Sequence, residues 1–168
     1  MNLETVLVDW VAKYGVETVL ERVVGHGPSA CDPLATRGKR VVVARDDRPL
    51  ETAMFDLVVV HGDEEPDAGE WRARLVGLAK RASKLFVVET RNPRPPSRIA
   101  RLIGASNGAA PWGSTAALAP VLWDIGRVRE HVFLGAASDA RSAPRHAFAI
   151  DVTPRTPQAR RKVRLGVV

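Results

Sequence analysis

The sequence predicts an α/β fold, a three-layer arrangement in which helices cover both faces of a mostly parallel sheet that ends in an antiparallel hairpin. Nearly continuous apolar runs of strand length, typical of strands buried on both faces, recur at residues 39–44, 55–60 and 85–88. Apolar residues at helical spacing predict helices over residues 68–83 and 116–124. The link between two further expected strands, 128–134 and 146–152, is too short for a crossover and favours a hairpin.

The amino-terminal residues 1–24 are expected to form two helices. Residues 3–12 place Leu3, Val6, Leu7, Trp10 and Val11 at helical spacing, and Gly15 ends this segment. Residues 16–24 repeat the pattern with valine and leucine. Shorter helices are expected over residues 29–36 and 97–103.

Length and composition indicate one domain, residues 1–152, followed by a basic tail, residues 153–168. The chain has 168 residues, of which 45% are hydrophobic and 26% charged, as in ordinary globular domains. Its single cysteine excludes an internal disulfide framework, and the four histidines have no metal-ligand spacing, so no metal site is expected. No apolar run is long enough to cross a membrane, and the first residues do not resemble a signal peptide. These features predict a cytoplasmic protein without membrane association.

Positive charge is concentrated in the second half of the chain. Residues 1–90 carry a net charge of −3 and residues 91–168 a net charge of +9, which gives +6 in total. One basic cluster consists of Arg91, Arg94, Arg98 and Arg101, and another lies in the tail. Such a field attracts anionic partners, nucleic acid among them, although a solvated basic face is the simpler interpretation.

The order of elements and three short motifs resemble the class I methyltransferases that use S-adenosylmethionine, which have a Rossmann-like fold. Residues 55–61, Phe-Asp-Leu-Val-Val-Val-His, resemble the fourth strand of that family, and residues 84–89 resemble its fifth. Residues 122–128 resemble the stretch in which a helix ends at a glycine before the sixth strand. The similarity covers about residues 40–152 and implies S-adenosylmethionine as cofactor and an unknown methyl acceptor.

The resemblance implies a cofactor site that is formed by residues in the first half of the chain. The family's loop, Gly-x-Gly-x-Gly after a strand with an acidic residue, corresponds here to Glu21 and to Gly25 and Gly27, so that two of three glycines are present. Glycines in this loop let backbone N–H groups approach the cofactor. Asp46 or Asp47, at the end of the next strand, would hold the ribose hydroxyls.

Two alternatives remain open for this region. The helical spacing of residues 16–24 favours a helix that Gly25 or Gly27 terminates, rather than a strand and a cofactor loop. Only eight residues separate Asp46 from Phe55, where the family has a helix and a strand. Either that unit is deleted, or residues 39–44 are the third strand and the cofactor half is missing.

On the acceptor side, His61 and Glu89 are the predicted catalytic residues, because both end strands at the edge where parallel α/β sheets bind ligands. The leading hypothesis is therefore methyl transfer from S-adenosylmethionine. The alternative is a non-catalytic methyltransferase-like binding or scaffold protein that lost the cofactor site and binds RNA or another partner through its basic half. A shortened sheet leaves an edge strand exposed, and a homodimer is one way to cover it.

Overall fold

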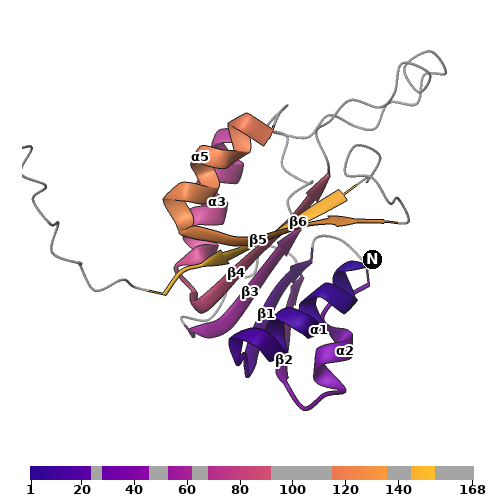
Figure 1. Cartoon of the computed structure of the whole chain (residues 1–168). Helices are drawn as coiled ribbons and strands as arrows, with labels where there is room; N and C mark the ends of the chain where they lie inside the picture. The colour runs from indigo at the N-terminus through magenta and orange to yellow at the C-terminus, as the bar shows by residue number, and fades with distance from the viewer. Residues whose placement is uncertain (24–27, 46–52, 62–67, 92–114, 136–144, 154–168) are drawn as a thin grey trace, which may run out of the picture.

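The computed structural model of the chain describes residues 1–23, 28–45, 53–61, 68–91, 115–135 and 145–153, and the account below concerns these residues. They form a three-layer α/β structure in which a central six-stranded sheet separates two pairs of helices (Figure 1). The helices are α1 (Leu3–Tyr14), α2 (Asp32–Ala35), α3 (Ala68–Ala79) and α5 (Thr115–Ile125). The strands are β1 (Thr18–Val23), β2 (Arg40–Arg45), β3 (Phe55–His61), β4 (Ala82–Arg91), β5 (Arg127–Leu134) and β6 (Arg145–Asp151).

The sheet is mostly parallel, as the sequence predicts. The strand order is β2-β1-β3-β4-β6-β5. The pairs β1–β2, β1–β3 and β3–β4 are parallel, and β6 runs antiparallel to both β4 and β5. The predicted carboxyl-terminal hairpin is therefore confirmed.

The expected second helix over residues 16–24 is wrong, because residues 18–23 form the strand β1. This strand lies between β2 and β3, and five of its six residues are buried. A strand that is covered on both faces has no need to alternate polar with apolar residues, so its valines and leucines fall at spacings that a helix also shows. Because residues 18–23 are not a helix, the interpretation of Gly25 or Gly27 as the glycine that ends this helix is also wrong.

The position of β1 also decides between the two interpretations of the short connection after β2. The unit β1–α2–β2 is present, and β3 pairs directly with the other side of β1. The structure therefore has the first two strands of the pattern, and the described residues between β2 and β3 contain neither the strand nor the helix that the family places after the second strand. As a result, β2 is the edge of the sheet among the described residues, and Val42 is 36% exposed.

Local sequence signals explain why α1 begins and ends where it does. The side chain of Asn2 accepts a hydrogen bond from the backbone N–H of Thr5 at 3.0 Å and caps the amino terminus. Gly15 adopts a left-handed conformation (φ +60°) and donates its N–H to the carbonyl of Val11. Leu7, between these caps, is fully buried against the sheet.

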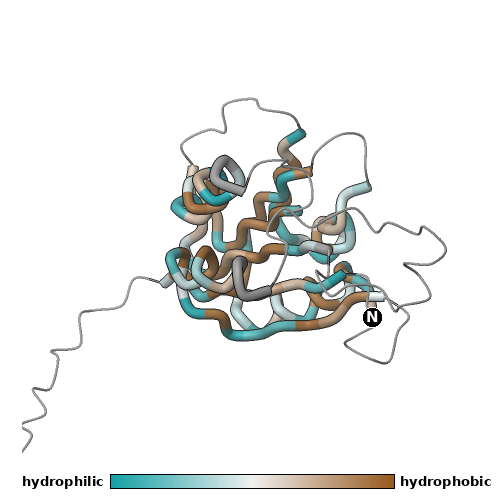
Figure 2. The backbone as a smooth tube through the Cα atoms, turned by 90° about the horizontal axis from the view of Figure 1, so that it is seen from above, coloured by the Kyte–Doolittle hydropathy of each residue, from teal (hydrophilic) through white to brown (hydrophobic). Residues whose placement is uncertain are grey.

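Each face of the sheet carries its own apolar core. Helices α1 and α2 cover one face, where the core includes Leu7, Leu34, Leu57, Val87 and Ala149. Helices α3 and α5 cover the other face, where it includes Leu20, Val58, Trp71, Phe86 and Ile150. Viewed from above, hydrophobic stretches run through the middle of the molecule (Figure 2).

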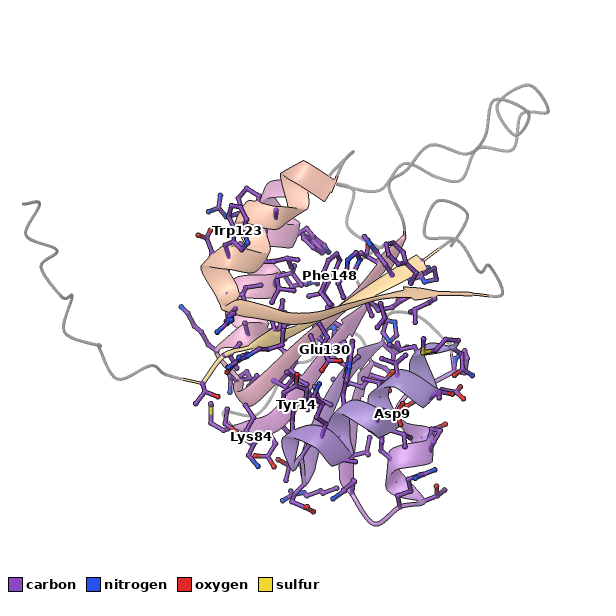
Figure 3. The ribbon with its side chains drawn as sticks, viewed as in Figure 1. Asp9, Tyr14, Lys84, Trp123, Glu130 and Phe148 are labelled. Atoms are coloured by element: carbon purple, nitrogen blue, oxygen red, sulfur yellow. The ribbon has the colours of Figure 1, made fainter. Side chains whose placement is uncertain are left out.

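A carboxylate on the last strand of the sheet, β5, attaches α1 to the sheet. Glu130 accepts hydrogen bonds from Trp10 Nε1 at 3.0 Å, Lys13 Nζ at 2.7 Å and Tyr14 Oη at 2.7 Å. Figure 3 shows Glu130 and Tyr14 directed toward one another from the strand and the helix. Burial and the neighbouring Glu130 carboxylate raise the pKa of Tyr14 to about 12. This contact fixes the orientation of α1, whose first turn lines the site described next.

Candidate functional site

A pocket of about 240 Å³ opens at the edge of the sheet where the parallel strands end. The strands contribute His61, Glu89 and Arg145 to its lining. The start of α1 contributes Asn2, Leu3 and Glu4, and the turn before α2 contributes Pro28, Ser29 and Ala30. The carboxyl edge of a parallel sheet is where open α/β folds bind ligands.

The register of the strands brings the polar side chains of this pocket to one face of the sheet. Glu21 on β1 pairs with Val59 on β3, and His61 lies two residues further along the same face of β3. His61 pairs in turn with Glu89 on β4. Glu89 pairs with Ala147 on β6, and Arg145 lies two residues before it, because β6 starts at this edge.

Four of these side chains form what we call the charge network: Glu21, His61, Glu89 and Arg145. His61 lies between two carboxylates, with Nε2 3.0 Å from Glu21 Oε1 and Nδ1 3.0 Å from Glu89 Oε2. Arg145 donates from Nε and Nη2 to the two oxygens of Glu89, and the Nη2–Oε2 distance is 2.5 Å. Carboxylates only accept hydrogen bonds, so the arrangement is satisfied when both ring nitrogens of His61 carry protons.

The carboxylate of Glu21 also holds the chain just before α2. It accepts hydrogen bonds from the hydroxyl of Ser29 and from the backbone N–H groups of Ala30 (2.8 Å) and Cys31 (3.3 Å). Its side chain is fully buried. Glu21 therefore positions Ser29, Ala30 and Cys31 and is not among the residues that line the pocket.

The network fixes the protonation states of its members. Burial disfavours the imidazolium form of His61, but the hydrogen bonds to Glu21 and Glu89 outweigh it and raise the pKa of His61 to about 9. Burial also opposes ionisation of Glu21, but hydrogen bonds from His61, Ser29 and Ala30 hold its pKa below the ordinary value. For Glu89, hydrogen bonds from Arg145 and His61 likewise outweigh burial and lower the pKa. At neutral pH the network consists of two carboxylates and two cations.

The structure brings together the two predicted catalytic residues, His61 and Glu89, in direct contact. The predicted cofactor residues Gly25, Gly27, Asp46 and Asp47 lie outside the described residues, between the end of β1 and Ser29 or directly after β2. Of the predicted anion-binding arginines, Arg94, Arg98 and Arg101 also lie outside them, and the backbone of Arg91 ends β4.

Arg145 and Ser29 are among the residues of this site that sequence reasoning missed. Arg145 lies at the start of a strand, and starts of parallel strands belong to the edge opposite the ligand site. Only the antiparallel direction of β6 brings it to this edge. The expected hairpin contained that signal, because the first residue of a reversed last strand meets the carboxyl ends of its neighbours.

Several solved structures with a similar fold are methyltransferases. A magnesium protoporphyrin IX methyltransferase from Synechocystis PCC 6803 with bound SAH matches 88% of this chain and 80% of its own, with 14% identity and a TM-score of 0.60. An S-adenosylmethionine-dependent methyltransferase from Clostridium acetobutylicum ATCC 824 matches 90% and 91%, with 7% identity and a TM-score of 0.62. The chain has the class I methyltransferase fold. An N-methyltransferase from Bradyrhizobium japonicum WM9 in complex with S-adenosylhomocysteine shares this fold at 15% identity and a TM-score of 0.57, over 90% of this chain and 86% of its own.

These similarities are structural. No protein-family model matches the sequence, and a search of curated proteins finds no similar sequence. One fold can support many chemistries, so the function has to be inferred from the residues of the site.

The pocket holds both carboxylates and cations in a volume of about 240 Å³, a lining that complements ligands with charged groups.

In the described part of the chain, no helix is long and apolar enough to span a membrane. In that same part, no group of three or more histidine, cysteine or acidic residues could hold a metal ion.

Proposed function

We propose that this protein binds S-adenosylmethionine at the carboxyl edge of its sheet and transfers the methyl group to an acceptor. The observation that carries the proposal is the charge network, which lies in a pocket at the ligand-binding edge of a methyltransferase fold. Gly25 and Gly27 would let the backbone approach the cofactor, and Asp46 or Asp47 would hold its ribose. His61, Glu89 and Arg145 would line the acceptor side.

Methyl transfer from this cofactor mainly requires that the methyl donor and the acceptor are held in the right positions. When bound, S-adenosylmethionine supplies a methyl group on a positively charged sulfur, which is already activated for in-line displacement. The protein contributes by holding the acceptor in line with that carbon and by excluding water. A network of four charged side chains with satisfied hydrogen bonds suits this role, because its members are held in one geometry.

Calorimetric titration with S-adenosylhomocysteine and S-adenosylmethionine tests the proposal. We expect saturable binding near micromolar affinity that Gly27→Val weakens by roughly tenfold or more, because the added side chain separates the backbone from the ligand. Gly77→Val is the matched control, because Gly77 lies on α3 with open space around it. No binding of either compound at millimolar concentration would overturn the proposal.

The second candidate is a binding module with this fold that does not use the cofactor. Two observations favour it: Val23 stands where the family has the first glycine of its loop, and among the described residues the sheet has one strand and one helix fewer than the family pattern. The partner would then be anionic and bound by the basic second half, or a second copy of the chain covering the β2 edge. The same titration separates the candidates, because this one predicts no binding of S-adenosylhomocysteine.

A further inference from the structure

A second and larger pocket opens at the edge of the sheet opposite the charge network. It has a volume of about 440 Å³ and lies where α5 ends, β5 begins and β6 ends. A volume of this size is in the range of ligand pockets in proteins. The pocket is lined by Trp123, Ile125, Gly126, Arg127, Asp151, Val152 and Thr153.

Gly126 brings the end of α5 against the end of β6. Its backbone N–H donates to the carbonyl of Leu122 at 3.0 Å, in the last turn of the helix. A Cβ at this position would collide with the backbone carbonyl of Asp151, so a residue without a side chain is needed here. This close approach places Trp123, in the same last turn, beside the final residues of β6.

Trp123 presents an aromatic ring to solvent at this pocket. The preceding residue, Leu122, is buried, whereas Trp123 is 72% exposed, the largest fraction among the described large hydrophobic residues. The indole projects from α5 (Figure 3). An exposed aromatic ring is a stacking surface for a nucleobase, because every base has a π face.

The charged groups around the pocket leave one cation available to a ligand. Asp151 accepts hydrogen bonds from Arg129 Nε at 3.0 Å and Arg129 Nη2 at 2.5 Å. Asp124 on α5 is paired with Arg72, so an arginine neutralises each of these carboxylates. Arg127 is exposed, and within the described part of the chain its guanidinium takes part in no hydrogen bond or ion pair. A guanidinium with unused donors is suited to a phosphate group.

The chain continues from this pocket into a strongly basic segment. Thr153 lines the pocket, and residues 154–168 contain four arginines, one lysine and no acidic residue. These five positive charges are covalently attached at the pocket, so they increase its attraction for an anionic chain. A polyanion with accessible bases fits this combination better than a single phosphate compound does.

We infer that this pocket binds single-stranded nucleic acid, with a base stacked on Trp123 and a neighbouring phosphate bound by Arg127. The basic residues 154–168 contact further phosphates along the strand. A duplex fits less well, because its bases are stacked on one another and are not available to the indole. The inference does not depend on the proposed function, since this pocket and the pocket of the charge network share no residue.

Fluorescence anisotropy of the full chain with a labelled ten-nucleotide adenine RNA tests the inference. An abasic oligonucleotide with the same number of phosphates and an RNA duplex of the same length are the parallel probes. We expect the single strand to bind with an affinity that falls as salt is added. The other two probes should bind roughly tenfold more weakly, because stacking on an aromatic side chain contributes about that factor per base. Equal or tighter binding of either parallel probe, or no binding of the single strand at low salt, would overturn the inference.

Variants localise the binding through the aromatic ring. Trp123→Ala is expected to weaken binding of the single strand by roughly tenfold, and Trp123→Phe by less, because a ring remains. Met54→Ala is the matched control, because Met54 is an exposed apolar residue outside the pocket. An affinity of Trp123→Ala equal to that of wild type, with its fold verified by thermal unfolding, would contradict the assignment.

The salt dependence tests the phosphate contact. Arg127→Gln is expected to weaken binding and to lower the slope of log affinity against log salt by roughly 0.7, the value for one phosphate contact with a single strand. Arg40→Gln is the matched control, because it changes an exposed arginine on β2, at the other end of the strand order. The same slope for wild type and Arg127→Gln would refute the contact.

Discussion

His61 makes the stability of this protein depend on pH in a direction that the structure specifies. The contacts with Glu21 and Glu89 raise its pKa from 6.5 to about 9 in the folded chain. A histidine whose folded pKa is raised stabilises the fold fully below its unfolded pKa, and this contribution is lost as the pH rises through the folded value. We therefore expect the free energy of unfolding to fall between pH ~6.5 and pH ~9.

The size of the effect follows from the shift. The change from 6.5 to about 9 corresponds to roughly 3 kcal/mol, lost at up to about 1.4 kcal/mol per pH unit within that window. The charged groups that face His61 are Glu21 from β1, Glu89 from β4 and Arg145 from β6. None of these three titrates in the window, because the pKa of each carboxyl is lowered and arginine stays protonated.

Urea unfolding measures the effect. Trp10 and Trp71 are buried, so tryptophan fluorescence follows the transition. The wild type is compared with His61→Gln at half-unit steps of pH across the window. Burial raises the pKa of the Cys31 thiol, which also lowers stability near the upper limit, but this contribution is the same in both proteins. We expect the wild type to lose roughly 3 kcal/mol more than the variant across the window. Parallel curves for the two proteins would refute the reasoning.

Three further predictions concern packing and use the same unfolding assay. Glu130→Ala removes the acceptor of three α1 side chains and should lower the free energy of unfolding by about 1–3 kcal/mol; a change near zero would mean that α1 is held by its apolar contacts alone. Gly126→Ala places a Cβ against the backbone carbonyl of Asp151 and should destabilise the chain by about 1–3 kcal/mol, whereas a neutral result would show that β6 can move away. Leu34→Ala removes a fully buried side chain of α2 and should lower the free energy of unfolding by about 2–5 kcal/mol; a loss under about 1 kcal/mol would mean that α2 adds little to the core on that face.

The fold class could be predicted because the strands that define it have strong local signals. The apolar runs that became β2, β3 and β4, and the short link between the last two strands, fixed the parallel sheet and its hairpin. The strand β1 could not be separated from a helix, because periodicity alone does not distinguish a strand buried on both faces from a buried helix.

The candidate site could be predicted only in part. The part that could not be predicted depends on how the strands pair. His61 and Glu89 end their strands at the same edge, and the general rule for α/β sheets identifies such residues. That Glu21 points at His61 depends on the register between β1 and β3, and that Arg145 reaches Glu89 depends on the direction of β6. Registers are set by contacts distant in sequence, so the contacts of Glu21 with His61 and of Arg145 with Glu89 could not be predicted from local patterns, although Glu21 stood out as an acidic residue at a strand and the expected hairpin put the start of the last strand at this edge.

We propose that the carboxyl edge of this sheet holds S-adenosylmethionine beside the charge network. A crystal structure of the protein grown with saturating S-adenosylhomocysteine tests this proposal most directly. We expect the thioether next to the pocket lined by His61 and Arg145, with the ribose toward Asp46 or Asp47. A ligand bound at any other surface, or an unchanged pocket without ligand at saturating concentration, would contradict it.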